Sequence, residues 1–336
     1  MSARRATNRP ITLRTAAHRF PRAANLLTAL LFLAPALIIF ALFKFLPMGR
    51  AMTMSLQEVN YYLGNRWVGL QNYTEVVTDE RFGQAIRNTL LLAVGATLGS
   101  ILLGLLLALL LEGQARHLWL IRTAVFLPTV AAMAVVAEVW RILYYPTADG
   151  AVNSVLGWIG LGPSQFTNSE DTSLLSVMAV GIWRGAPYDM MIFLAGLAGV
   201  DRTLYEAAEA DGARTWRRLW HVTFPALRPV FVILVTLACI RGLRVFTEVY
   251  LMTNGGPNGS TETVMTLIFK RGLEQHELGI AAAGSMILLA ATVALTLAVQ
   301  AARARRGGLA RAAAGSAGAS RQDFGQGSVS KREVTA

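Results

Sequence analysis

The sequence is poor in the residues that most often carry catalysis or bind metals. Its only cysteine is Cys239, so neither an intramolecular disulfide nor a cysteine-cluster metal site can form. The four histidines are dispersed along the chain and suggest no metal site or catalytic group. Lysine is also scarce, and none of Lys44, Lys270 and Lys331 follows a glycine or precedes a serine or threonine. Because a phosphate-binding P-loop needs that arrangement, the sequence contains no such loop.

Charged residues are few as well. They make up 15% of the 336 residues, against 54% hydrophobic residues, and the mean hydropathy is +0.45. Such a chain is too apolar for an ordinary soluble domain and is typical of a protein that crosses a membrane several times. The formal net charge of +11 could suggest nucleic-acid binding, but that function needs the basic residues on one solvated surface. Their distribution argues against it, so we predict an all-α membrane protein that binds no nucleic acid.

Six apolar stretches are long enough to cross a bilayer, which takes about 20 helical residues. They are residues 26–46, 88–111, 121–143, 173–198, 229–251 and 279–301. An arginine-rich arm precedes the first stretch and resembles the charged region of a secretory signal peptide, but the stretch is too long for one and no small-residue cleavage site follows. We therefore expect a retained first helix and a single six-helix domain over residues 26–302.

The basic residues predict the orientation of these helices. No Lys or Arg occurs between Tyr144 and Thr172, whereas five arginines lie in the next loop between the predicted spans. Because cytoplasmic loops carry an excess of Lys and Arg, both termini are predicted to be cytoplasmic. The arm 1–25 and the tail 303–336 have little apolar surface to bury, and we expect both to be disordered.

The polar loop 201–229, between the fourth and fifth predicted spans, is the most unusual segment of the chain. Thr203 and Glu206 have the spacing of a capping box, which predicts a helix that starts at Thr203. Gly212 favours the left-handed conformation that ends a helix. A second helix should follow, with tryptophans on one face and arginines on another.

Pro225 and Pro229 are expected to stop this second helix and to start the fifth span. From its residues alone, the helix fits two functions equally well. It could lie in the headgroup region with its tryptophans toward lipid, or it could dock on another protein.

The segment Glu206-Ala207-Ala208, followed after three residues by Gly212 and then by the two prolines, resembles the EAA loop of permease subunits in binding-protein-dependent ABC importers. Further segments agree in order with the carbohydrate-importer branch, to which the maltose and glycerol-phosphate permeases belong: Gly69-Leu70-Gln71-Asn72-Tyr73, Asn88-Thr89, Trp183 and Thr253-Asn254-Gly255-Gly256-Pro257. The resemblance covers roughly residues 26–302. Leu219 and Phe224 differ from the residues usual in this family, which could alter the fine packing of the loop.

This resemblance implies a six-helix bundle of the type I importer class in the bacterial cytoplasmic membrane. The implied subunit is no enzyme: it takes a sugar-like solute from an external binding lipoprotein and moves it by alternating access. A second, different permease and two ATPase subunits are the implied partners. ATP and Mg²⁺ would be bound by those ATPases, and this chain would hold no cofactor or metal. The residues implied to couple to the ATPase are Glu206, Ala207, Ala208, Asp211, Gly212 and Ala213.

Charged residues within the predicted spans point to a polar path. Insertion of one charge at a helix centre costs about 2.5–3.5 kcal/mol, so such groups should face a cavity or each other. Arg241, Arg244 and Glu248 have i, i+3, i+7 spacing and are expected on one helical face, with Arg244 able to pair with Glu248. The candidate path residues are Glu138, Trp140, Trp183, Tyr188, Asp189, Arg241, Arg244, Phe246 and Glu248. Arg141 and Arg184 are further charges near or within the spans.

Each path residue also has a purely structural interpretation. The charges could tie helices together or bind the partner permease, and the aromatic rings could pack between helices rather than stack on a sugar.

Two other classes of membrane protein would leave a different pattern in the sequence. A secondary transporter driven by an ion gradient should show paired broken helices in two related halves, and a membrane enzyme should show clustered acid and base groups. Neither pattern is found in the sequence.

Overall fold

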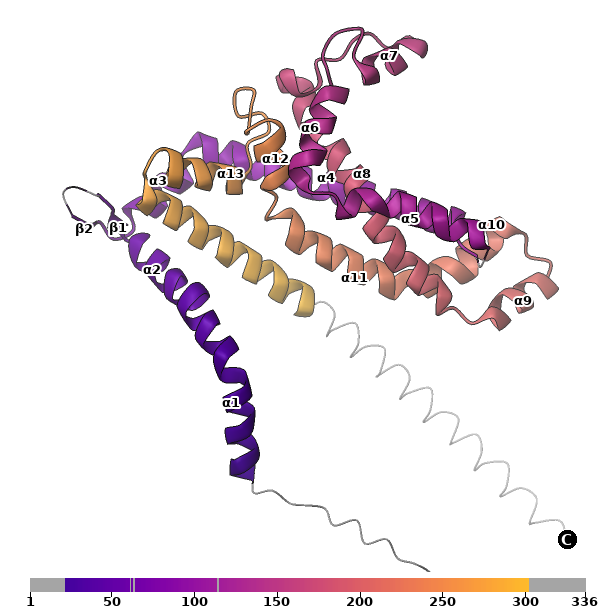
Figure 1. Cartoon of the computed structure of the whole chain (residues 1–336), viewed down its shortest axis with the longest axis horizontal. Coiled ribbons are helices and arrows are strands. Elements are labelled where there is room, and N and C mark those ends of the chain that lie inside the picture. Colours follow the sequence, from indigo (N-terminus) through magenta and orange to yellow (C-terminus); the bar gives the residue numbers. More distant parts are fainter. Residues whose placement is uncertain (1–21, 61, 63, 114, 302–336) are drawn as a thin grey trace, which may run out of the picture. The chain divides into compact units, whose positions relative to one another are not determined.

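The computed structural model describes residues 22–60, 62, 64–113 and 115–301, and the chain divides into two units at residue 53 (Figure 1). In the first unit, α1 (Arg22–Phe40) continues through a π-helical turn (Ala41–Phe45) into α2 (Leu46–Met54). The expected disorder of residues 1–25 and 303–336 falls almost wholly outside the described residues. Helix α1, however, already includes the last four residues of the predicted arm.

The second unit is almost entirely helical. Its only strands among the described residues, β1 (Gln57–Glu58) and β2 (Arg66–Trp67), pair antiparallel with Gln57 opposite Trp67. The remaining elements are α3 (Gln71–Thr78), α4 (Glu80–Leu110), α5 (Arg116–Val130), α6 (Met133–Leu143), α7 (Ala151–Trp158), a 3₁₀ turn (Phe166–Asn168), α8 (Glu170–Ala198), α9 (Arg202–Ala210), α10 (Thr215–Arg218), a π turn (Leu219–Thr223), α11 (Phe224–Gly242), α12 (Thr247–Met252), α13 (Val264–Phe269), a π turn (Lys270–Glu274) and the helix Leu278–Ala301.

Helices α4 and α8 form the centre of this unit, with α11 packed against both and α5 against α8 (Figure 1). Small residues allow the two backbones to approach closely. A Cβ on Gly104 would lie 2.8 Å from the carbonyl oxygen of Ala186, and a Cβ on Gly185 would lie 3.2 Å from Ser100 Cβ. Large side chains such as Phe193 and Leu227 are fully buried beside this contact. The close approach therefore fixes where α11 can pack.

The described residues contain four helices long and apolar enough to cross a membrane, and a bent pair that would make a fifth span. The four are Thr28–Met54, Glu80–Leu110, Thr215–Gly242 and Leu278–Ala301. The all-α prediction is confirmed, while the count of six stays a prediction. Helix α8 has 29 residues but is not among the four, because polar and charged residues such as Arg184 and Asp189 interrupt its apolar sequence.

Two predicted spans are wrong as continuous helices. The stretch 121–143 is bent by 98° between α5 and α6, where Ala131 and Ala132 are extended just after Pro128. The stretch 229–251 does not match either, because the helix begins at Thr215 and ends at Gly242, and α12 is a separate short helix. Hydropathy alone reveals neither the bend nor the break.

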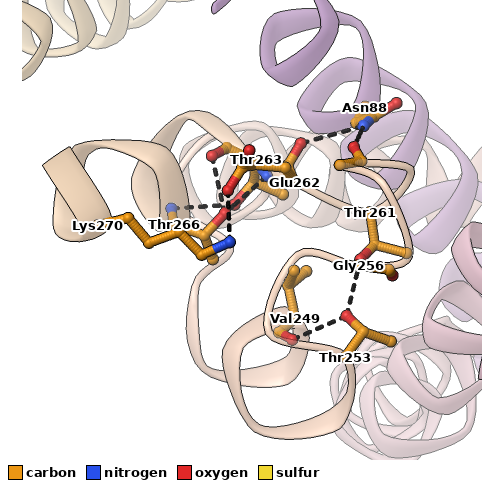
Figure 2. Close-up of polar contacts among 10 residues, drawn as sticks. Asn88, Val249, Thr253, Gly256, Thr261, Glu262, Thr263, Thr266 and Lys270 are labelled. Carbon is orange, nitrogen blue, oxygen red and sulfur yellow. Dashed lines mark hydrogen bonds and ion pairs between the residues drawn. The ribbon is translucent and has the colours of Figure 1, made fainter. Parts of the chain in front are cut away.

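Two buried asparagines explain part of the sequence pattern. Asn72 Nδ2 donates to the carbonyl oxygens of Ser55 and Gln57, both at 3.0 Å, and so ties α3 to the start of β1. Asn88 Nδ2 donates to the carbonyls of Gly259 at 3.0 Å and Glu262 at 3.1 Å (Figure 2). Each amide group thus donates to two backbone carbonyls of another segment of the chain.

The Thr253–Thr263 loop, drawn in Figure 2, is held by its own polar side chains. The Thr261 hydroxyl donates to the Gly256 carbonyl at 2.9 Å and lies 2.7 Å from the Thr253 hydroxyl. Lys270 Nζ pairs with Glu262 Oε1 at 2.7 Å. As the run of glycines and proline predicts, the chain turns sharply here, with a φ of +78° at Gly255.

Replacing Gly104 with alanine tests the close contact of α4 and α8. The added Cβ would meet the backbone of α8, so we expect a loss of about 1–3 kcal/mol in the free energy of unfolding. Gly83→Ala is the matched control on the same helix, since its Cβ meets nothing within 4 Å. Thermal unfolding in detergent should show a lower midpoint for Gly104→Ala alone. Equal midpoints for the two variants would contradict the packing described above.

Candidate functional site: a polar loop and a charged cavity

Helix α9 forms the first half of the polar loop, and its start differs from the prediction. The helix begins at Arg202, and the carboxylate of Asp201 accepts a hydrogen bond from the Thr203 N–H at 3.0 Å. The predicted capping box of Thr203 and Glu206 is therefore wrong, because Asp201 already caps the helix. The same hydrogen bond from the Thr203 backbone lowers the pKa of the Asp201 carboxyl below its usual value.

The end of α9 agrees with the prediction for Gly212. This residue has a φ of +73°, its N–H donates to the Glu209 carbonyl, and the Ala213 N–H donates to the Ala208 carbonyl, both at 2.9 Å. These two bonds form a Schellman motif, which satisfies the last carbonyls of the helix. A Cβ at Gly212 would meet no atom within 4 Å. Glycine is thus favoured here by the backbone angle and not by crowding.

The second half of the loop is the start of a long helix. Residues Thr215–Gly242 form one continuous helix of 28 residues, so the prediction that Pro225 and Pro229 stop it is wrong. The π turn accounts for this difference, because the Phe224 N–H donates to the Leu219 carbonyl, five residues back, just before the first proline. Such local adjustments allow proline within membrane helices.

Two side-chain contacts hold α9 against the long helix. The Tyr205 hydroxyl lies 3.0 Å from Thr223 Oγ1, and Arg218 Nη1 lies 3.1 Å from Glu209 Oε2. Among the six residues implied to couple to an ATPase, Ala208 and Ala213 are half-buried. The exposed ones are Glu206, Ala207, Asp211 and Gly212. These four leave a polar surface with little side-chain bulk at one end of the long helix.

At the other end of the long helix, α4, α8, α11 and the segment 243–248 enclose a cavity of about 520 Å³. This volume lies within the range of roughly 300–1,000 Å³ that is usual for small-molecule sites. No aromatic side chain in the described part of the chain lines it. The residues that give it polar or charged side chains are Thr97, Ser100, Arg184, Arg241, Arg244 and Glu248.

Two ion pairs lie at the cavity. Arg184 of α8 approaches Glu248 of α12 to 3.5 Å, and Arg241 of α11 approaches Asp189 of α8 to 3.7 Å. The Asp189 carboxylate is nearly fully buried and also accepts a hydrogen bond of 2.7 Å from the Ser100 hydroxyl. Arg244 makes no ion pair with any residue that the structure describes.

The prediction that Arg241, Arg244 and Glu248 share one helical face is wrong. Helix α11 ends at Gly242, Arg244 lies in a turn, and Glu248 belongs to α12 and pairs with an arginine of α8. The break leaves the Val245 carbonyl outside a helix, where it accepts a hydrogen bond of 3.0 Å from the Thr263 hydroxyl. A contact between residues 18 positions apart thus permits the break.

Only part of the predicted path is brought together. Arg241, Arg244 and Glu248 line the cavity, and Tyr188 and Asp189 lie behind Arg241 without lining it: the Arg241 guanidinium carbon is 5.0 Å from the Tyr188 ring centre. The others do not line it. Glu138 is exposed and pairs with Arg141 at 3.0 Å.

The remaining predicted aromatic residues pack on each other. The rings of Trp140 and Trp183 are 5.4 Å apart, and those of Phe246 and Tyr250 are 5.1 Å apart. Thr97 and Ser100 were missed because single hydroxyl groups in an apolar run give no sequence signal. Among the described residues, no group of three or more His, Cys, Asp or Glu side chains is placed to hold a metal ion.

Comparison with known proteins shows which family has this arrangement. A family model described as "Binding-protein-dependent transport system inner membrane component" matches residues 100–306, a span that contains the polar loop and most of the residues that line the cavity. The chain belongs to this family. It is therefore a permease subunit of the inner membrane, a transport protein and not an enzyme.

Two relatives illustrate the similarity. The permease is 32% identical over 280 residues to the probable ABC transporter permease protein YurN of Bacillus subtilis. The aligned region covers 81% of this chain and 94% of that protein. It is 32% identical over 274 residues to the sn-glycerol-3-phosphate transport system permease protein UgpA of Agrobacterium fabrum, covering 81% and 93%. The permease is thus similar to these proteins over nearly their whole length.

Solved structures agree. A crystal structure of a bacterial ABC transporter that imports the acidic polysaccharide alginate matches with a TM-score of 0.73 at 26% identity, covering 84% of this chain and 96% of that one. A second, of the alginate transporter in complex with a periplasmic protein bound to an alginate pentasaccharide, matches with a TM-score of 0.70 at 25% identity, covering 83% and 93%. The permease is a membrane-spanning subunit of an ABC importer.

The Arg241–Asp189 pair can be tested by a double-mutant comparison. Arg241→Ala leaves the buried Asp189 carboxylate without this counter-charge, which we expect to lower the free energy of unfolding by about 1–2 kcal/mol, less than a fully buried pair because Arg241 is half exposed. Adding Asp189→Asn should restore most of the loss, since a neutral amide needs no counter-charge. Unfolding midpoints of the four proteins would reveal this rescue, and a double variant no more stable than Arg241→Ala would contradict it.

Proposed function

We propose that the permease moves a sugar or sugar-like solute through a path that includes the cavity, and that its polar loop couples this movement to a separate ATPase. The observation that carries the proposal is the continuous helix Thr215–Gly242. It begins directly after the exposed loop and ends at the cavity. A helix of 28 residues is roughly 42 Å long and carries both functions on one element.

The coupling surface is the exposed end of α9 together with the Gly212 turn. Glu206, Ala207, Ala208, Asp211, Gly212 and Ala213 would dock on a cytoplasmic ATPase that binds ATP and Mg²⁺. Their exposure and lack of bulk support this role, since a partner can approach the helix closely. The contacts from Tyr205 and Arg218 would carry a movement of α9 into the long helix.

Residues at the cavity form the candidate path, namely Asp189, Tyr188, Arg241, Arg244 and Glu248, joined by Arg184 and Ser100. The names of the similar proteins support a sugar-like solute, since they include a transporter of sn-glycerol-3-phosphate and an importer of alginate. Glu138, Trp140, Trp183 and Phe246 would then have structural roles.

The partners follow from the importer assignment. We infer a second, different permease subunit, two ATPase subunits and an external solute-binding protein, the last supported by the periplasmic protein in the alginate transporter complex. Six spans with both termini in the cytoplasm would place the polar loop on the ATPase side. Transport would proceed as a shift between inward-open and outward-open bundles, each favoured by different partners.

Charge reversal in the loop tests the coupling. Glu206→Lys should leave the permease inserted but reduce ATP-driven uptake to a small fraction of wild type, because the loop would no longer dock on the ATPase. Glu112→Lys, at another exposed position, is the matched control. Membrane abundance and uptake in proteoliposomes are the measurements. Normal uptake by Glu206→Lys would contradict the coupling role. A secondary transporter would instead take up solute without ATP.

Two substitutions of Gly212 separate backbone strain from charge. Gly212→Asp adds a carboxylate at a φ of +73° on the proposed docking surface, and we expect loss of solute-stimulated ATPase activity. Gly212→Asn tolerates the same backbone angle without the charge and should retain more activity. If both variants retain wild-type ATPase stimulation, the turn is not part of the docking surface.

Removal of the Arg244 side chain tests the path. Arg244→Ala should lower uptake more than membrane abundance, because the side chain lines the cavity without an ion pair to any described residue. Arg87→Ala, an exposed arginine of α4 that does not line the cavity, should change neither. Equal losses of uptake and abundance in Arg244→Ala would favour a purely structural role.

A further inference from the structure

The cavity has a positive charge that its own acidic groups do not balance. Among the described residues, three arginines line it, and Glu248 is the only acidic residue that does so. Asp189 lies just behind Arg241 and compensates that residue. After the two ion pairs are counted, the Arg244 guanidinium remains without an opposite charge among the described residues.

The lining is also unusual for a site that recognises a neutral sugar ring. Such a ring is commonly held against the apolar face of an aromatic side chain, yet no aromatic residue lines this cavity. The aromatic candidates Trp140, Trp183 and Phe246 are occupied by one another and by neighbouring rings. Recognition here would have to come from guanidinium and hydroxyl groups.

From these two observations we propose that the cavity accepts a solute carrying an anionic group, a carboxylate, sulfate or phosphate, with Arg244 as its charge partner. A guanidinium presents a planar fork of N–H donors that matches the oxygens of such groups. Arg244 is exposed at the cavity, so an incoming solute can reach its guanidinium directly. The inference rests on the proposed function, in that the cavity is taken to be part of the solute path.

Neighbouring groups suit this role. Arg184 and Glu248, which also line the cavity, form a long ion pair of 3.5 Å. One nitrogen of that arginine, Nε, is buried without a hydrogen-bond partner. Neutralising Glu248 would therefore free the Arg184 guanidinium to contact the anion. Such a change should strengthen the binding of an anionic solute, whereas a structural defect would weaken it.

Binding of matched probes to the whole importer complex tests the proposal. Glucuronate and glucose 6-phosphate would each be compared with glucose, using saturation-transfer NMR on the complex in nanodiscs without its binding protein. At least one charged probe should bind about three- to tenfold more tightly than glucose, the gain expected from one charge-assisted contact. If glucose binds as tightly as both charged probes, the proposal is wrong. The same result would follow if another subunit neutralised Arg244, and it would overturn the proposal in that case too.

Variants locate the charge that matters. Arg244→Gln should remove the preference for charged probes over glucose, and Arg244→Lys should keep part of this preference. Glu248→Gln should increase it by freeing Arg184. Arg87→Gln, an exposed arginine outside the cavity, is the control and should leave it unchanged. A preference that survives Arg244→Gln, or that falls in Glu248→Gln, would contradict the assignment.

The coupling variant separates this inference from the proposed function. Glu206→Lys should abolish ATP-driven uptake and leave the preference for charged probes intact. If uptake persists while the preference is present, only the coupling assignment fails. If the variant is uncoupled but the wild-type complex shows no preference, only the anionic substrate class fails.

Discussion

The close approach of α4 and α8 is the constraint on which the rest of the second unit depends. At Gly104 the two backbones are so near that a single methyl group would collide with the Ala186 carbonyl. Only at this separation can the Ser100 hydroxyl reach the Asp189 carboxylate at 2.7 Å. The same pair of helices supplies one wall of the cavity and the surface on which α11 packs. Small residues therefore determine both the stability of the bundle and the position of its charges.

Charge placement in this apolar chain follows from the cost of burying ions. Asp189 is buried with a hydrogen bond and an arginine, and Arg184 and Glu248 lie together across two helices. An isolated charge in such a place would cost several kcal/mol, so pairing is expected on physical grounds alone. Arg244 differs from these residues, because it is exposed at the cavity and has no counter-charge in the described part of the chain, which leaves it open to a ligand.

Much of this arrangement follows from the sequence, and the differences have physical causes. Hydropathy located three of the four long apolar helices, and Gly212 identified the end of α9, because both signals are local. The bend after Pro128 and the break after Gly242 give no signal in hydropathy, and at the second one the Val245 carbonyl is satisfied by Thr263, 18 residues further along the chain. Likewise, Glu248 lies within helical reach of Arg244 along the sequence but meets Arg184 across the cavity. Which charge pairs with which is a property of the tertiary structure.

The central claim is that the coupling loop and the cavity lie at the two ends of one rigid helix, Thr215–Gly242. Spin labels would be attached to cysteines introduced at Arg217 and Val235 in a Cys239→Ala background. Double electron–electron resonance would then measure the distance between the two labels in the reconstituted importer. The two distance distributions should coincide in the nucleotide-free and ATP-bound states, since a rigid helix moves as a body. A shift of more than about 3 Å, the rise of two helical residues, would show that the helix deforms and would contradict the claim.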